Sequence, residues 1–247
     1  MEHSTLIHFI FGDLLQAELK SRHFVPHFHE EYSIGWIHDG YCNMECDGTL
    51  TKIVPGQLIL LNPYQVHSAR TSSFLSYEMR YVKQAFVHDF LGELKAFSHK
   101  VVTAPEVIQA LEKGKDDTAI YQAVFSQYAH APLQISLEKN RLLQKACHFI
   151  EGQWENPLSL HDLSNFLGLS PTYCSRWFKK NIGIPPRTYH RLFRLAKAKD
   201  MIRKGISLSD AAFACGFSDQ SHMTKELSTF FGVTPANLFR KQDRTQQ

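Results

Sequence analysis

Between Phe24 and Val82 the chain alternates hydrophobic and polar positions in short runs, and pairs of turn-forming residues separate the runs. A period of two places successive side chains on opposite faces of a strand. We therefore predict strands at residues 32–37, 41–45, 50–54 and 57–61. The predicted turns are Asp39-Gly40, Asp47-Gly48, Pro55-Gly56 and Asn62-Pro63. Short strands at this spacing indicate a small all-β barrel or jelly roll.

The rest of the chain follows a helical period. Hydrophobic residues recur at helical spacing from residue 85 to 128, which predicts helices flanking the barrel. A segment around Pro132 has neither pattern and indicates a linker. The predicted fold class is α+β. It has an N-terminal β-barrel domain with flanking helices over residues 1–130, a linker over 131–139 and an all-α domain over 140–247.

One segment of the helical part occurs twice. Leu158-Ser159-Leu160 is matched forty-eight positions later by Ile206-Ser207-Leu208. Farther along the offset becomes 49, so that Arg176 matches Lys225. Two copies are too few for a stacked repeat array. We interpret them as one DNA-reading unit used twice, with a basic residue at the same internal position.

Each copy has the signals of two short helices joined by a tight turn. In the first copy Ser159 is a predicted N-cap, Gly168 ends the first helix, and Ser170-Pro171 opens the second. The corresponding signals of the second copy are Ser207, Gly216 and Ser218, and the second helices end at Gly183 and Gly232. We predict helix-turn-helix motifs at about residues 159–181 and 207–231. The alternative is an ordinary pair of helical hairpins in a bundle.

The charge distribution favours the DNA-reading interpretation. Residues 140–247 contain 16 Lys and Arg against 8 Asp and Glu, a net charge of +8, whereas residues 1–139 have a net charge of −5. A basic domain of this size is typical of proteins that bind a phosphate backbone. Residues 186–204 have an apolar stripe and indicate one helix about 28 Å long. Such a rod holds two recognition helices about one DNA turn apart.

The last hundred or so residues resemble the AraC/XylS-type transcription regulators. The resemblance rests on residues 212–222, AFACGFSDQSH, followed by residues 230–235, FFGVTP. It implies two helix-turn-helix motifs bridged by a long helix, a homodimer, and RNA polymerase as a partner of an activator. It also implies contacts with double-stranded DNA through Thr172, Ser175, Arg176, Lys179, Gln220, Ser221, Thr224 and Lys225. The residue types agree, because Arg and Lys suit guanine and Gln suits adenine in the major groove.

His27-Phe28-His29 and His67 resemble the metal-site motifs of cupins, so the N-terminal domain is expected to be a cupin-like β-barrel. His-x-His places two imidazoles on one strand face, and a third histidine completes a site for Fe, Mn, Ni or Zn. The cupin pattern expects a carboxylate four residues after the second histidine, where this chain has Ser33. We therefore predict no metal and a pocket for a small-molecule effector, lined by His27, His29, Trp36, Tyr41 and His67. Metal binding by the three histidines and a purely structural role are the alternatives.

Other chemistry is not indicated. The sequence has no Gly-rich phosphate loop and no Ser/His/Asp arrangement, so we predict neither enzymatic activity nor a cofactor. Without a signal peptide or a run of 18 apolar residues, a cytoplasmic protein without membrane contact is expected. Two further functions stay open. One is a metal-dependent cupin enzyme or metal sensor fused to a DNA-binding domain, and the other is a DNA-binding protein whose barrel only dimerises.

Overall fold

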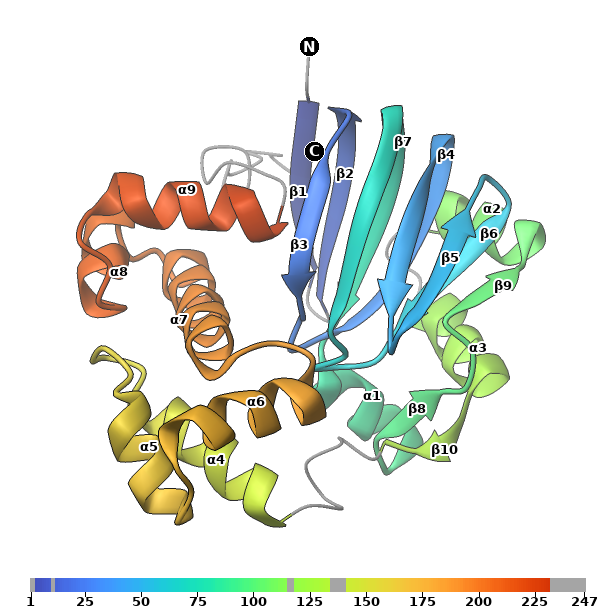
Figure 1. Ribbon diagram of the computed structural model, residues 1–247. Helices are drawn as coiled ribbons and strands as arrows, with labels where there is room; N and C mark the ends of the chain where they lie inside the picture. Colours follow the sequence, from blue (N-terminus) through green and yellow to red (C-terminus); the bar gives the residue numbers. More distant parts are fainter. Residues whose placement is uncertain (1–2, 10–11, 115–117, 134–140, 232–247) are drawn as a thin grey trace. The chain divides into compact units, whose positions relative to one another are not determined.

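The computed structural model describes residues 3–9, 12–114, 118–133 and 141–231 (Figure 1). The chain divides into two compact units. Among the described residues, the first unit comprises 3–23 and 29–133, and the second comprises 24–28 and 141–231. The strand within 24–28 is nevertheless hydrogen-bonded into the sheet of the first unit, so it is described with that sheet.

The first unit is built on one eight-stranded sheet. Its strand order is β1-β2-β7-β4-β6-β9, with β3 also paired to β7 and β5 to β4. The strands are β1 (His3–Phe9), β2 (Gly12–Lys20), β3 (His23–His27), β4 (Tyr32–Cys46), β5 (Thr49–Ile53), β6 (Gln57–Leu61), β7 (His67–Val82) and β9 (Val101–Thr103). The long strands β4 and β7 pair antiparallel over most of their length. This confirms the predicted strand-rich, cupin-like domain.

The predicted turn at Asp39-Gly40 is wrong, because β4 runs through these residues without a break. Its register against β7 shifts between Ile37 and Asp39 and again between Gly40 and Cys42. Such irregularities bend a strand, and glycine supports them by adopting a positive φ, here 86°. Asp-Gly therefore marks a bulge here. The tight turn predicted at Asp47-Gly48 is confirmed, with φ values of 50° and 73°.

The two faces of the sheet carry different chemistry. Trp36 pairs with Glu78 and Ile34 with Arg80 across β4 and β7, so these four side chains share one face. The opposite face carries an apolar core. Its buried members are Ile37, Cys42, Met44, Cys46, Ile53, Ile59, Leu61 and Leu75, with Tyr77, Met79 and Val101 packed against them.

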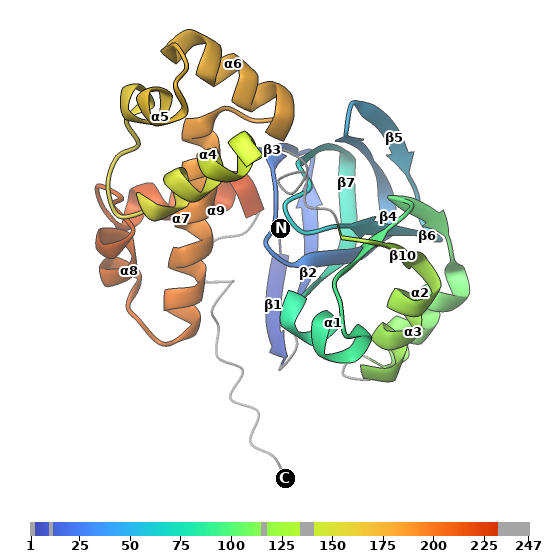
Figure 2. The same ribbon diagram turned by 90° about the horizontal axis from the view of Figure 1, so that it is seen from below.

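Three helices pack together along one side of the sheet (Figure 2). They are α1 (Gln84–Leu91), α2 (Pro105–Lys113) and α3 (Thr118–Tyr128). The helical pattern predicted over residues 85–128 is thus confirmed in part. Two short strands interrupt it, β8 (Lys95–Phe97) and β9, and β8 pairs with β10 (Ala129–Pro132). Residues 134–140 lie outside the described part of the chain, so the predicted linker stays a prediction.

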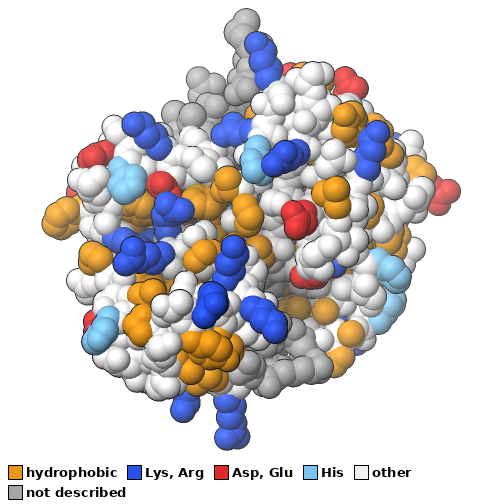
Figure 3. Space-filling model, viewed as in Figure 1, with side chains coloured by type: hydrophobic (Ala, Val, Ile, Leu, Met, Phe, Trp, Pro, Cys, Tyr) orange, Lys and Arg blue, Asp and Glu red, His pale blue; other side chains and the backbone are white. Residues whose placement is uncertain are grey.

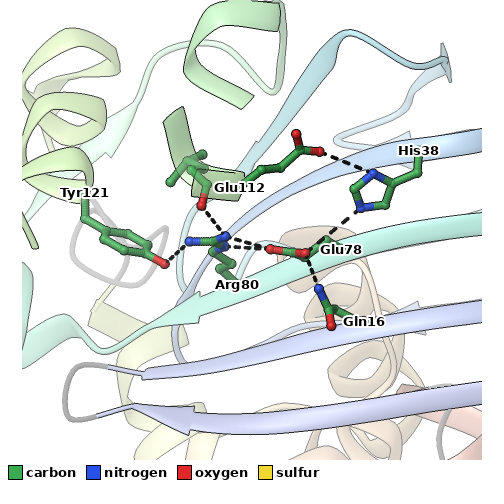
Figure 4. A network of polar contacts seen from close by, with 7 residues as sticks. Gln16, His38, Glu78, Arg80, Glu112 and Tyr121 are labelled. Atoms are coloured by element: carbon green, nitrogen blue, oxygen red, sulfur yellow. Dashed lines mark hydrogen bonds and ion pairs between the residues drawn. The ribbon is translucent and has the colours of Figure 1, made fainter. Parts of the chain in front are cut away.

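A buried ion pair joins the sheet to these helices (Figure 4). Arg80 donates to Glu78 Oε1 through Nε at 3.0 Å and Nη2 at 2.7 Å, and both side chains are almost fully buried. The same guanidinium donates to the Tyr121 hydroxyl of α3 and to the Leu111 carbonyl of α2. Gln16, His38 and Glu112 continue the network beyond Glu78. The guanidinium thus links β7 to both helices.

The second unit is helical. Its helices are α4 (Arg141–Gly152), α5 (Leu160–Leu167), α6 (Pro171–Ile182), α7 (Pro186–Arg203), α8 (Leu208–Ala214) and α9 (Gln220–Phe231). Figure 1 shows α7 running between the α5–α6 pair and the α8–α9 pair. This confirms two helix-turn-helix motifs joined by a long helix. Among the described residues, no helix combines the length and apolar character needed to cross a membrane.

Candidate nucleic-acid interface and effector site

The first helix-turn-helix motif, α5–α6, has the predicted end signals. The Ser159 side chain accepts a hydrogen bond from the Asp162 backbone N–H at 3.2 Å and caps α5. Gly168 ends α5 in the left-handed region, with φ of 68°. Helix α6 then begins with Pro171 at its first position, and its N-cap, Ser170, makes no side-chain cap hydrogen bond. These signals set a short turn between the two helices.

The second motif, α8–α9, follows the first with one change. Ser207 caps α8 by accepting from the Asp210 backbone N–H at 3.1 Å. The predicted cap of α9 at Ser218 is wrong, because α9 begins one residue later at Gln220. Asp219 takes this place, and its carboxylate accepts from the His222 backbone N–H at 2.7 Å. That hydrogen bond lowers the pKa of Asp219. The turn between α8 and α9 is therefore where the repeat offset changes from 48 to 49.

Helices α6 and α9 have matching buried faces at this offset of 49. Cys174 and Phe178 of α6 are fully buried, and so are Met223 and Leu227 of α9. Phe178 therefore packs in the core of the first motif, whereas its neighbour Trp177 is only half-buried. The burial pattern fixes which face of each helix packs inside the unit and leaves the other face to solvent.

The residues predicted to touch DNA lie on the outward faces of α6 and α9. The exposed ones are Thr172, Arg176 and Lys179 on α6 and Gln220, Ser221 and Lys225 on α9, and the half-buried ones are Ser175 and Thr224. Figure 3 shows Lys and Arg side chains gathered over this helical unit. The contacts with DNA themselves stay predictions.

Two further outward residues were not among those predicted to touch DNA. Tyr173 is 51% exposed on α6, and His222, 49 positions later, has a 48% exposed side chain on α9. Each lies one residue before the buried Cys174 or Met223. Because the buried positions follow from the helical period, the same period would have identified these neighbours as solvent-facing.

Two of the arginines on α7 make contacts inside the helical unit. Arg191 Nε lies 3.1 Å from Glu226 Oε2 of α9. Arg194 donates from Nε to the Cys215 carbonyl, and its guanidinium lies 5.2 Å from the Phe217 ring centroid. A Cβ at Gly216 would collide with Arg194. These arginines attach α7 to the second motif.

In the first unit, the structure brings three predicted histidines together. His27 ends β3, His29 follows two residues later, and His67 begins β7. All three are buried, and one ring nitrogen of each lies within 4.8 Å of those of the other two. The His29 ring centroid lies 5.4 Å from that of His67 and 4.7 Å from that of Tyr81.

Hydrogen bonds to the backbone orient two of these rings. His27 Nδ1 lies 2.7 Å from the Val25 carbonyl, and His67 Nδ1 lies 2.9 Å from the Gln65 carbonyl. A carbonyl oxygen only accepts, so Nδ1 carries the proton in both rings, and in the neutral ring Nε2 keeps the lone pair. Burial lowers the pKa of His67, which favours that neutral form.

The other two predicted pocket residues lie elsewhere. Tyr81 is the cross-strand partner of Ser33, so Trp36, three positions farther along β4, points to the opposite face. There it packs against Arg80, with the guanidinium carbon 5.0 Å from the ring centroid. Tyr41 is 38% exposed and lies under the Lys52 ammonium. The register shifts of β4, which the sequence did not reveal, lie between Trp36 and Tyr41.

A helical unit that presents two matched recognition helices, together with a strand-rich unit, defines a two-part regulator of the kind that binds DNA and a small molecule. Residues 13–144 match the AraC-like ligand binding domain, and residues 163–241 match a helix-turn-helix domain. The chain belongs to the AraC family. It is a DNA-binding transcription regulator with an N-terminal ligand-binding domain.

Relatives support this assignment along the chain. The HTH-type transcriptional regulator YbfI of Bacillus subtilis is 30% identical over 223 residues, which cover 81% of each chain. The HTH-type transcriptional activator RhaS of Escherichia fergusonii is 24% identical over 60% of this chain and 58% of its own. The crystal structure of unsaturated fatty acid-bound ToxT from Vibrio cholerae has the same fold, with a TM-score of 0.63. It covers 98% of this chain and 99% of ToxT at 15% identity.

Proposed function

We propose that α6 and α9 each read the major groove of double-stranded DNA with their outward residues. The observation that carries this proposal is the shared pattern of buried and exposed positions at an offset of 49. At 1.5 Å per residue, the 18 residues of α7 span about 27 Å, which suits two helices placed about one DNA turn apart. A single chain then contacts two successive major grooves.

The two recognition helices differ in charge. Helix α6 carries Arg176, Lys179 and Lys180 and no acidic residue, whereas α9 carries Lys225 beside Glu226. Affinity for the phosphate backbone grows with the number of phosphates that basic side chains neutralise. We therefore assign the larger share of affinity to α6. Gln220 and Lys225 of α9 suit adenine and guanine and contribute to sequence choice.

We propose that the small-molecule effector binds on the sheet face that carries His29, Tyr81 and the apolar core. Apolar walls with a few polar groups are typical of such sites, and His27, His29 and His67 supply the polar groups. Trp36 and Tyr41 are left out of this site because they lie elsewhere. The fatty acid bound by ToxT supports a ligand-binding role for this fold.

The partners of the regulator follow from its class. We propose a homodimer that contacts RNA polymerase and activates transcription in the cytoplasm, where its DNA target lies. The activator RhaS supports the sign of regulation. Effector binding acts by favouring one arrangement of the dimer, which requires different affinities for the two arrangements.

The DNA-reading proposal is tested by removing the matched basic residues. The operator is first selected from random duplexes, and affinity is then measured by gel shift at fixed salt. We expect Arg176→Ala and Lys225→Ala to lose about 1–3 kcal/mol each for the selected site. Lys113→Ala, which removes an exposed charge at the end of α2, is the matched control and should bind as the wild type does. Unchanged affinity in both recognition-helix variants contradicts the assignment.

A further inference from the structure

The three buried histidines of the first unit have the arrangement of a metal site. We propose that His27, His29 and His67 bind one divalent transition-metal ion that prefers imidazole nitrogen, such as Zn²⁺. This inference concerns the same side chains as the proposed effector site. It stands independently of the DNA-reading proposal, because none of the three residues lies in a helix-turn-helix motif: His27 ends β3, His67 begins β7, and His29 follows β3 by two residues.

The positions of the rings suit a single ion. The three ring nitrogens lie within 4.8 Å of one another. A tetrahedral zinc site has Zn–N distances of about 2.0–2.1 Å, which place its ligand nitrogens about 3.4 Å apart. Small rotations of the imidazoles close that difference. His27 and His29 are separated by one residue, and His67 comes from the neighbouring strand, so the ligands approach from two chain segments.

The hydrogen bonds of the rings prepare them as ligands. Metal-bound histidines nearly always donate the proton of their other ring nitrogen to a carbonyl or carboxylate, which fixes the tautomer and the ring orientation. His27 and His67 both do so, through the carbonyls of Val25 and Gln65. Both rings are thus held in the tautomer that leaves Nε2 free to bind a metal. Packing in a core does not require that two neighbouring histidines share this tautomer.

Three protein ligands leave one coordination position open, as in catalytic rather than structural zinc sites. Ser33 lies on the same sheet face, as the cross-strand partner of Tyr81, whose ring packs on His29. The Ser33 hydroxyl is buried and has no hydrogen-bond partner among the described residues. It is suited to bond an oxygen ligand, a water or an effector oxygen, in the open position. In the sequence, Ser33 counted against a metal because it stands where cupins have a carboxylate. We now include Ser33 in the proposed site as the partner of the fourth ligand.

Metal binding is measured directly on the full chain. The protein is stripped with a chelator, dialysed and titrated with Zn²⁺ by isothermal calorimetry. We expect one ion per chain. His67→Ala should weaken binding by at least about 100-fold, since even the loss of a partner that only orients a ligand costs 10–100-fold. The matched control is His99→Ala, which removes an exposed histidine outside the cluster and should leave the titration unchanged.

A second measurement separates loss of a ligand from loss of the fold. Co²⁺ replaces Zn²⁺ and gives visible absorption bands that report its ligands, and far-UV circular dichroism checks each variant. Folded His27→Ala and His29→Ala proteins should lose or shift these bands, and Ser33→Ala should keep them. A folded wild-type protein that binds Zn²⁺ no better than His67→Ala does overturns the metal site. The gel-shift result with Arg176→Ala is unaffected by that outcome, so the two proposals fail separately.

Discussion

At the scale of single residues, Arg80 shows how a charge is kept inside the first unit. Its guanidinium is matched by Glu78, by the Tyr121 hydroxyl and by the Leu111 carbonyl, and Trp36 covers one side. Burying an ion pair requires removing both charges from water, so the pair is not in itself a source of stability. Removing one partner alone leaves the other charge buried without compensation.

We therefore predict that Arg80→Met lowers the free energy of unfolding by about 3–5 kcal/mol. Urea unfolding followed by Trp36 fluorescence, with Trp154 and Trp177 replaced by Phe, measures this change. The double variant Glu78→Met/Arg80→Met should be less destabilised than Arg80→Met, because no uncompensated charge remains. Lys95→Met breaks only the solvent-accessible pair with Glu93 and should change stability by less than about 1 kcal/mol. An Arg80→Met effect as small as that of Lys95→Met contradicts this account of the pair.

At the scale of elements, the repeat provides an internal comparison of helix caps. Ser159 and Ser207 bond to backbone N–H groups of α5 and α8, whereas Ser170, before α6, makes no such bond. We predict that Ser159→Ala and Ser207→Ala each destabilise the second unit by about 0.5–2 kcal/mol. Ser170→Ala, at an equally exposed position, should have a smaller effect. Thermal unfolding of the three variants provides the ranking, and equal losses in all three are incompatible with the cap assignment.

The elements also show which features a sequence reveals. Helix ends at Ser159, Gly168 and Ser207 were predictable because they depend on local bonds and on glycine's access to positive φ. The bulges around Gly40 were not, because Asp-Gly suits a turn and a bulge equally and only the pairing with β7 decides. The sheet face on which Trp36 lies could not be predicted either, because only the strand register shows that it is opposite to the face of His29. Two members of the histidine cluster, His27 and His29, were predictable from their His-x-His spacing, and His67 from the resemblance to cupins, but the hydrogen bonds of the rings were not.

At the scale of the whole molecule, opposite charges belong to different parts of the chain. Residues 140–247 carry a net charge of +8 and residues 1–139 a net charge of −5. The basic part contains both helix-turn-helix motifs, which belong to one compact unit. Attraction to DNA is therefore expected to reside in that unit, while the acidic part contributes no phosphate contact.

We predict that a fragment starting near Asn140 folds and binds DNA without the strand-rich unit. Its affinity should fall steeply with salt, with a slope of about −0.9 in log K per log salt for each phosphate neutralised. Fluorescence anisotropy at several salt concentrations measures this slope, and Arg176→Ala in the fragment should make it shallower. A fragment comprising residues 1–133 is the control and should show no affinity. A folded basic fragment that does not bind DNA even at low salt contradicts the assignment of DNA binding to the helical unit.

The shift of the repeat offset from 48 to 49 lies in the turn before α9, and beyond it α6 and α9 correspond position by position. Because of this correspondence, the outward residues of one helix can be placed at the matching positions of the other. Residues 172, 175 and 176 can be transplanted onto 221, 224 and 225 without disturbing the buried Met223 and Leu227. A regulator altered in this way carries the same proposed base-reading residues twice. Its preferred operator is then expected to become a direct repeat of a single half-site.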